Sequence, residues 1–416
     1  MSIVSLFIIL KMIMMIFVDS NFIAHSSSIF ISSYSRFCRM HFRGYQRSRI
    51  IMMPEGPEVR TTVDSIKNTL EEVNTNYKKY KNDEEQFRSS NPWYLSRITF
   101  LSGRYHEKDV LNLHELNKEL PIALKTVACK GKFIFFTLDK SFSLWSTLGL
   151  SGGWTVSPRH AKSSPYLSDH IRLCLTFIRN GTNEDRAGMN TTTQEMSLFF
   201  YDQRNFGTFK ISTDPQELVK KLDSLGHCWL SGPPTLQQFR SILAEKRTQA
   251  KPLAVLLMNQ KKTAGVGNYL LSEILYSCRI YPWATCAQLS EEDIQELYFV
   301  TLSTVVKSYL SQTDSATREF YLQRFCDSWL QRTFYDGAVD DDADVVGGSL
   351  WSGREQLMEY IQKPFHFTVY MQSHCPRGYR IARAEGPHLR TVHWVQELQT
   401  KHAPPSSALD GSTARA

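Results

Sequence analysis

The chain has 416 residues, enough for two or three domains, and its 42% apolar and 21% charged residues are typical of a globular protein. Its formal net charge is +7, but residues 1–52 contain six lysines and arginines against a single acid, so the other residues carry a net charge of only +2. This balance excludes a protein that is basic throughout residues 53–416. Any nucleic-acid-binding surface there has to be a local cluster of basic residues.

The first 53 residues are expected to be either a presequence or the product of a mis-predicted start upstream of Met53. Ile3–Val18 is apolar, but Lys11 interrupts it and no basic region precedes it, so neither a membrane anchor nor a signal peptide fits well. Ser26–Arg49 is rich in serine and arginine and has no acid, which is typical of a mitochondrial transit peptide. Composition alone leaves both alternatives open.

Residues 54–214 are predicted to form a β-sandwich of two antiparallel sheets with one helix at its start. A turn at Pro54–Pro57 precedes an amphipathic helix, because apolar residues recur from Val59 to Leu70 at spacings of four, three and four. Strand-like runs follow at Arg97–Ser102, Phe133–Leu138, Ser143–Leu148, Ile171–Phe177 and Ser197–Tyr201.

From residue 215 the periodicity becomes helical, and residues 215–330 are predicted to form a second, helical domain. Its helices are expected at Thr235–Lys246, Lys251–Gln260, Asn268–Cys278 and Glu291–Ser311. Residues 312–355 are interpreted as an insertion that is partly disordered. Within it, residues 331–355 are predicted to be a separate disordered segment between the helical domain and the hairpin. Residues 356–400 then form a β-hairpin unit, and 401–416 a disordered tail. The predicted fold class is therefore α+β and multidomain.

The sequence contains eight cysteines, and none of them forms a CxxC pair. They are expected to be reduced thiols of an intracellular protein.

The most specific motif is Met53-Pro54-Glu55-Gly56-Pro57-Glu58-Val59-Arg60. If Met53 is the initiator, its removal exposes the secondary amine of Pro54, a nucleophile that can form an iminium with C1′ of a deoxyribose. Glu55 could then protonate the sugar ring oxygen or the leaving base and later remove a proton. Interpreted without regard to any motif, the same residues are a turn that leads into a helix.

This stretch resembles the N-terminus of the formamidopyrimidine-DNA glycosylase and endonuclease VIII family, whose mature chains begin Pro-Glu. The Pro-Glu-Gly-Pro-Glu form is more similar to the endonuclease VIII branch. Further motifs follow in the order found in the family, at Cys129–Phe136, Thr147–Trp154, Tyr201–Thr208 and Leu257–Leu275. The resemblance covers roughly residues 54–400.

The resemblance implies a role for one or two residues in each motif of the first domain. Lys132 would reach into the active site and hold a phosphate that flanks the lesion. Leu150 would be pushed into the duplex where the damaged nucleotide was, Arg204 would bond the orphaned base, and Phe206 would wedge the adjacent stack. Read in isolation, Lys132 would be a strand end, and Leu150 and Phe206 would be core residues.

The motif of the second domain resembles the family's helix-two-turn-helix. Glycines in Gly265–Gly267 let the turn run close to a ligand, and Asn268 is expected at a helix N-cap, where free backbone N–H groups would form a phosphate site. Lys261 and Lys262 would add positive charge for DNA binding. Glu273 matches a carboxylate that lies near the family's active site and supports its geometry.

The segment Tyr370–Gln399 resembles the family's C-terminal zinc finger but departs from it. Related fingers place their ligands at the positions of Cys375, Tyr379, Val395 and Leu398. Because only Cys375 can bind zinc, a zincless finger held by packing around Trp394 is predicted, with no metal. Three histidines could replace the lost ligands: His374, His388 and His393. Arg390 matches the finger arginine that grips phosphates near the flipped nucleotide.

The resemblance implies a bifunctional DNA glycosylase and abasic-site lyase of base excision repair. Such an enzyme would excise oxidised bases, pyrimidines by analogy with the Pro-Glu-Gly-Pro form, and cleave by β,δ-elimination through a Schiff base on Pro54. Damaged DNA is the expected partner, and the protein is expected to be a monomer that needs no cofactor and has no stable membrane association. Its expected location is the nucleus, or the mitochondrion if residues 1–52 are a presequence.

Two alternatives stay open. With residues 1–53 attached, Pro54 is a tertiary amide without a nucleophilic lone pair, so the chain would be a DNA-damage-binding protein without lyase activity. If Ile3–Val18 were translated and retained, the chain could instead be tethered to a membrane.

Overall fold

A computed structural model describes residues 53–72, 92–107, 109–156, 169–180, 193–324 and 354–405. The chain divides into two units, 1–51 and 52–416, and every described residue belongs to the second. The predictions for residues 1–52, for nearly all of the 331–355 insertion and for most of the C-terminal tail therefore lie outside the described residues. The described part contains no helix that is both long and apolar enough to cross a membrane.

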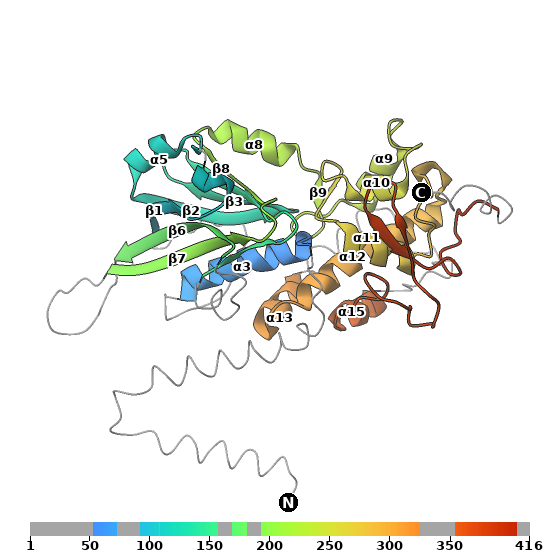
Figure 1. Ribbon diagram of the computed structural model, residues 1–416. Helices are drawn as coiled ribbons and strands as arrows, with labels where there is room; N and C mark the ends of the chain where they lie inside the picture. The colour runs from blue at the N-terminus through green and yellow to red at the C-terminus, as the bar shows by residue number, and fades with distance from the viewer. Residues whose placement is uncertain are drawn as a thin grey trace, which may run out of the picture. The chain divides into compact units, whose positions relative to one another are not determined.

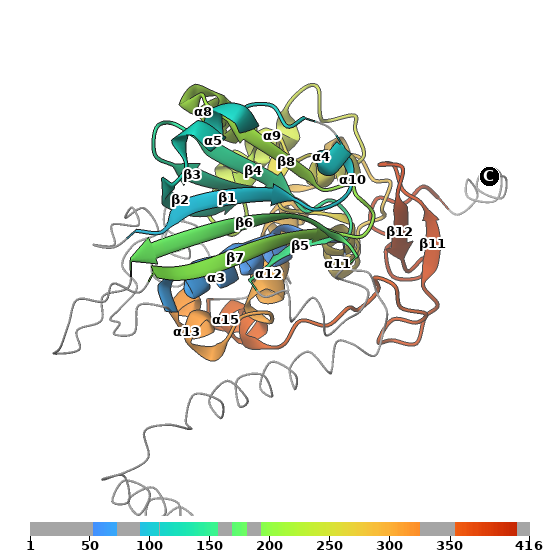
Figure 2. The same cartoon turned by 60° about the vertical axis from the view of Figure 1, so that its left-hand side comes forward.

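Eight strands form one antiparallel sheet in the order β5-β7-β6-β1-β2-β3-β4-β8 (Figures 1 and 2). The strands are β1 Tyr94–Phe100, β2 Ile122–Lys130, β3 Phe133–Leu138, β4 Ser143–Thr147, β5 Gly152–Thr155, β6 Ile171–Asn180, β7 Thr193–Asp202 and β8 Thr208–Ser212. The four-stranded halves that correspond to the two predicted sheets are joined only where Tyr94 and Leu95 of β1 pair with β2. All five predicted strands are present, β3 with its predicted ends and the other four with shifted ends, whereas β2, β5 and β8 were not predicted.

Helix α3, Gly56–Glu72, closes the core of this domain, as its apolar spacing predicts. Val59, Val63, Ile66 and Leu70 are at most 1% exposed and belong to one apolar cluster with side chains from both halves of the sheet. The helix lies against the sheet and extends to α12 of the helical part (Figure 1). Two short helices, α4 at Arg104–Glu107 and α5 at Leu113–Glu119, complete the domain.

The helical part contains all four predicted helices with ends shifted by a few residues. Its elements are α8 Pro215–Asp223, α9 Leu236–Ala244, α10 Leu253–Met258, α11 Asn268–Ser277, the 3-10 turn Cys286–Gln288, α12 Glu291–Leu310, α13 Ser315–Arg324 and α15 Arg354–Gln362. A short parallel pair, β9 His227–Cys228 with β10 Thr263–Ala264, links two of its loops. Helix α13 falls in the segment 312–355 that was interpreted as an insertion, so this part of the segment is ordered helix.

The C-terminal hairpin pairs β11, Ala382–Glu385, with β12, Thr391–Trp394, and packs beside α11 (Figure 2). Its small core is formed by Val369, Cys375, Ile381 and Val395. Trp394 was predicted to be the centre of this packing, but it faces the helical part, where its ring meets the rings of Tyr281 and Trp283 edge-on at 5.5 and 5.4 Å. The hairpin therefore has its own apolar core, and Trp394 anchors it to the helical part. The six described cysteines are free.

Trp394→Ala is expected to lower the free energy of unfolding by about 3 kcal/mol, because it removes a large buried ring and leaves a cavity beside two other aromatic rings. Urea unfolding followed by circular dichroism would measure the loss. Leu389→Ala in the same hairpin is the control, because Leu389 is 83% exposed and its truncation should change the free energy by less than about 0.5 kcal/mol. Equal losses in the two variants would contradict the anchoring role.

Candidate active site

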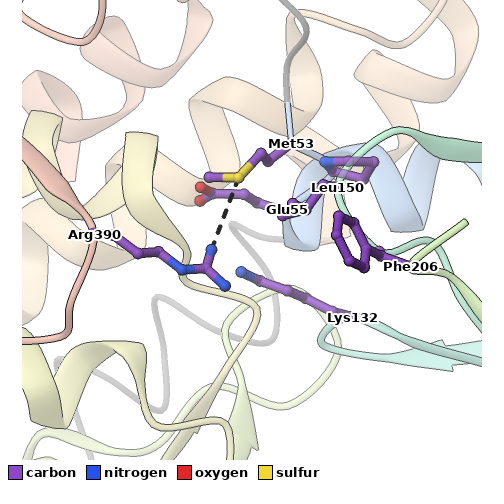
Figure 3. A pocket seen from close by; sticks show the side chains of 8 residues that line it. Met53, Glu55, Lys132, Leu150, Phe206 and Arg390 are labelled. Atoms are coloured by element: carbon purple, nitrogen blue, oxygen red, sulfur yellow. Dashed lines mark hydrogen bonds between the residues drawn. The ribbon is translucent and has the colours of Figure 1, made fainter. Parts of the chain in front are cut away.

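Six of the residues predicted for the site line one pocket of about 350 Å³ (Figure 3). The pocket is lined by Met53, Pro54, Glu55, Lys132, Gly149, Leu150, Phe206 and Arg390. The start of α3, the β2–β3 turn, two loops of the sheet domain and the C-terminal hairpin each contribute to it. Lys132 and Arg390 reach into it from opposite sides (Figure 3).

Glu55 is held by the N-terminus of α11. Its carboxylate accepts hydrogen bonds from the backbone N–H groups of Gly267 at 2.7 Å, Tyr269 at 2.8 Å and Leu270 at 3.3 Å. The N–H groups of these three residues are therefore not free for a phosphate, as had been predicted for this helix end, because the protein's own carboxylate accepts from them. The predicted N-cap is also shifted by one residue, since Gly267 occupies it and Asn268 is the first residue of the helix.

The protonation of Glu55 is poised near neutral pH. Burial raises its pKa from 4.5 to about 7, Lys132 opposes this rise, and the neighbouring Glu58 carboxylate adds to it. Glu58 itself accepts a hydrogen bond from the Glu55 N–H at 3.0 Å and from Tyr269 Oη at 3.0 Å. A carboxyl group with a pKa near 7 can donate a proton in one step and accept one in the next.

Glycines allow the sheet domain and the helical part to meet at this site. The Gly56 N–H donates to Gly265 O at 2.8 Å, and Gly265 has a φ of 112°, a conformation that favours glycine. A Cβ on Gly131, just before Lys132, would lie 2.6 Å from Ala264 Cβ. A Cβ on Gly267 would lie 2.3 Å from the Glu55 carboxyl carbon. These close approaches place Glu55 and Lys132 together.

Lys132 and Arg390 supply the positive charge of the pocket. Burial lowers the pKa of Lys132, while Glu55 raises it and Arg390 lowers it further. The Arg390 side chain donates from Nη1 to Met53 Sδ at 3.8 Å (Figure 3). Two cations beside one carboxyl group can bind the phosphates on either side of a nucleotide.

Glu273, farther along α11, positions the segment that leads into the hairpin. Its carboxylate accepts hydrogen bonds from the backbone N–H groups of Thr368, Val369 and Tyr370 at 2.9–3.1 Å. Burial raises the pKa of Glu273, and these N–H donors oppose the rise. One helix thus holds Glu55 at its N-terminus and the base of the Arg390 hairpin at its middle.

The other predicted residues lie outside the pocket lining. Arg204 is exposed on the loop that also carries Phe206, and Lys261 is exposed. Lys262 forms an ion pair with Glu245. Asn268 is buried, and its Nδ2 donates to Thr391 O of the hairpin at 2.8 Å.

The four finger positions that hold the metal in relatives do not form a metal site in this chain. Cys375 and Val395 are buried in the hairpin core and Leu398 packs against it, whereas Tyr379 is 41% exposed. Within the described residues, no three His, Cys, Asp or Glu side chains are grouped as a metal site.

Two family models match the sequence of this chain over the domains that form the site. The model of the formamidopyrimidine-DNA glycosylase N-terminal domain matches residues 53–209, and that of the formamidopyrimidine-DNA glycosylase H2TH domain matches residues 230–319. The matched residues make up more than half of the chain. The chain belongs to the formamidopyrimidine-DNA glycosylase and endonuclease VIII family.

Individual members of this family are distant relatives of the chain. A formamidopyrimidine-DNA glycosylase of Arabidopsis thaliana is 31% identical over 121 residues, 29% of this chain and 30% of the relative. One from Thermus thermophilus is 29% identical over 170 residues, 41% of this chain and 53% of the relative. The chain thus spans about half or less of the length of these relatives.

A family member of solved structure has the same fold. The Lactococcus lactis enzyme, in complex with DNA that contains an oxidised pyrimidine, aligns with a TM-score of 0.53 at 19% identity. The alignment covers 84% of this chain and all of that one.

Several residues that shape the site escaped the sequence prediction. Glu58 was assigned only to the first turn of a helix, although a glutamate three residues after Glu55 is the spacing that lets a carboxylate cap a helix N-terminus. Gly267 was interpreted only as a flexible turn residue. Asp202 lies in the Tyr201–Thr208 motif, but nothing in its sequence context indicates which groups donate hydrogen bonds to its carboxylate.

Proposed function

We propose that the chain is a bifunctional DNA glycosylase and abasic-site lyase that repairs oxidised DNA bases. The observation that carries the proposal is the pocket in which Pro54, Glu55 and Lys132 meet, with the pKa of Glu55 near 7. Family membership supports the same reaction class. Damaged DNA is the proposed partner.

In the proposed reaction the Pro54 amine attacks C1′ of the damaged nucleotide while the bond from C1′ to the base breaks. Glu55, in its protonated form, gives a proton to the sugar ring oxygen or the departing base. Opening of the sugar leaves an iminium between Pro54 and C1′. Loss of a C2′ proton then expels the 3′ phosphate, and a second elimination expels the 5′ phosphate. Lys132 and Arg390 hold the flanking phosphates.

Oxidised pyrimidines are the proposed lesions. The Pro-Glu-Gly-Pro start of the motif favours them, because this form resembles the endonuclease VIII branch of the family. The hairpin is proposed to act as a zincless finger. Its apolar core at Cys375 and Val395 supports this, because packing can hold the strands where a metal holds them in other fingers.

Borohydride trapping on a duplex oligonucleotide with an oxidised pyrimidine tests the proposal. Protein begun at Met53, which loses its initiator, is expected to form a covalent adduct, whereas a chain that retains residues 1–53 is not. Insertion of one alanine between Met53 and Pro54 should abolish the adduct because it acylates the proline nitrogen.

The second candidate, a damage-binding protein without lyase activity, is favoured if Met53 is retained. In that case Pro54 is an amide and Met53 fills part of the pocket beside Arg390. Tight binding to the lesion duplex with no adduct from either form would contradict the enzyme and support this candidate.

A further inference from the structure

Asp202, at the end of β7, is a buried carboxylate that the proposed reaction does not use. It is 1% exposed. Its Oδ1 accepts hydrogen bonds from Ser151 Oγ at 2.8 Å and from the Arg204 N–H at 3.2 Å, and its Oδ2 accepts one from the Gly207 N–H at 2.5 Å. A buried carboxylate costs free energy unless donors satisfy it, so these contacts define where both loops lie.

These donors come from two separate loops that both end at the pocket. Ser151 follows Leu150 in the β4–β5 turn, and Arg204 and Gly207 bracket Phe206 in the β7–β8 turn. The Arg204 N–H also donates to Ser151 Oγ at 3.0 Å. The two backbones touch, because a Cβ on Gly149 would lie 2.6 Å from Gly207 N. We define these two turns, 148–151 and 203–207, as the paired turns.

Two arginines fix the paired turns to the sheet domain. Arg172 of β6 donates from Nε and Nη2 to Asp202 O at 2.9 and 2.7 Å, and from Nη1 to Ser102 Oγ at 2.8 Å. Arg104 of α4 donates to Gly207 O. The backbone on both sides of Phe206 is therefore anchored.

This rigid base carries an apolar edge. Phe206 is 59% exposed, and with Leu150 it lines the pocket near Glu55 (Figure 3). Opening a base stack costs a few kcal/mol, so a wedge that enters it has to be stiff, or the loop yields instead of the DNA.

We propose that the Asp202 carboxylate joins the paired turns into one rigid wedge, so that Leu150, Arg204 and Phe206 enter the duplex together, and that Asp202 is the positioning residue for opening the damaged site. The inference rests on the proposed function, because it assumes that damaged duplex DNA is the substrate.

Stopped-flow fluorescence tests it with protein begun at Met53 and a lesion duplex that carries 2-aminopurine next to the lesion, since unstacking brightens this base. Asp202→Asn, which removes one acceptor oxygen from the paired turns, is expected to slow opening by on the order of 10-fold to 100-fold. Binding to a single strand with the same lesion should change less than about 2-fold, because no stack has to open there. The matched control is Asp223→Asn, an exposed aspartate at the end of α8.

Ser151→Ala is the second variant, for the case that Asp202→Asn does not fold. It removes only one hydroxyl group and is expected to keep the fold. It should slow opening in the same direction, and the double variant should be no slower than Asp202→Asn. Opening at the wild-type rate in both variants, equal losses on duplex and single strand, or no opening by the wild type would overturn the inference. A wild type that opens the duplex but forms no trapped adduct would overturn the proposed function alone.

Discussion

Glu55→Gln is expected to slow excision of an oxidised base by about 10³-fold, within the range of general acid catalysis. Glutamine keeps the size of the side chain and one acceptor for the α11 N–H groups, but it has no proton to give to the leaving base. The same variant should cleave a preformed abasic site with a much smaller loss, because no base has to depart. Single-turnover rates on the two substrates measure the difference.

The pH profile provides a second measure of Glu55. Its pKa is raised to about 7, so the carboxyl group is protonated below pH 7 and loses its proton above it. Excision that depends on the protonated form should therefore fall about 10-fold per pH unit above pH 7. In Glu55→Gln this decline should disappear.

The control for this variant is Glu359→Gln, whose side chain is 70% exposed on α15 and contributes nothing to the pocket. It should match the wild type in rate and in pH profile. Retention of the decline above pH 7 in Glu55→Gln would assign the titration to another group and contradict the acid role. Equal losses on the damaged base and the abasic site would instead indicate a distorted site.

The sequence predicted those parts of the fold in which periodicity is uninterrupted. Helix α3 has a complete apolar stripe, and β3 was predicted with its observed ends because apolar residues fill it. Strand β2 escaped because Lys125 and Thr126 break its alternation where the pairing with β3 shifts register. Strand β5 is four residues long and begins with two glycines, which have weak strand preference.

The site was predicted where a motif names a residue and not where a contact crosses the chain. Pro54, Glu55 and Lys132 follow from motif order, and the structure brings them to one pocket. The α11 cap does not follow, because asparagine is a favoured N-cap and local sequence assigns that place to Asn268. The actual capping carboxylate lies more than 200 residues away in the chain.

Gly267→Ala is expected to slow excision by on the order of 100-fold, although the backbone there suits any residue. Its φ of −133° is extended, so alanine meets no conformational penalty and would ordinarily add a few tenths of a kcal/mol of stability. The new Cβ, however, would lie 2.3 Å from the Glu55 carboxyl and 2.4 Å from Lys132 Nζ. The flexible lysine can move aside, but Glu55 is fixed by three backbone N–H groups and would be displaced.

Displacement of Glu55 should also uncap α11 and lower the free energy of unfolding by about 1–3 kcal/mol, because buried N–H groups lose their acceptor. Single-turnover excision and thermal unfolding would be measured beside Gly232→Ala, a matched glycine with no atom within 4 Å of its would-be Cβ. That control should keep both its rate and its stability. Wild-type excision by Gly267→Ala would mean that the reaction does not need Glu55 where α11 holds it. A slow variant that also loses the decline above pH 7 would tie catalysis to the contact between Gly267 and Glu55.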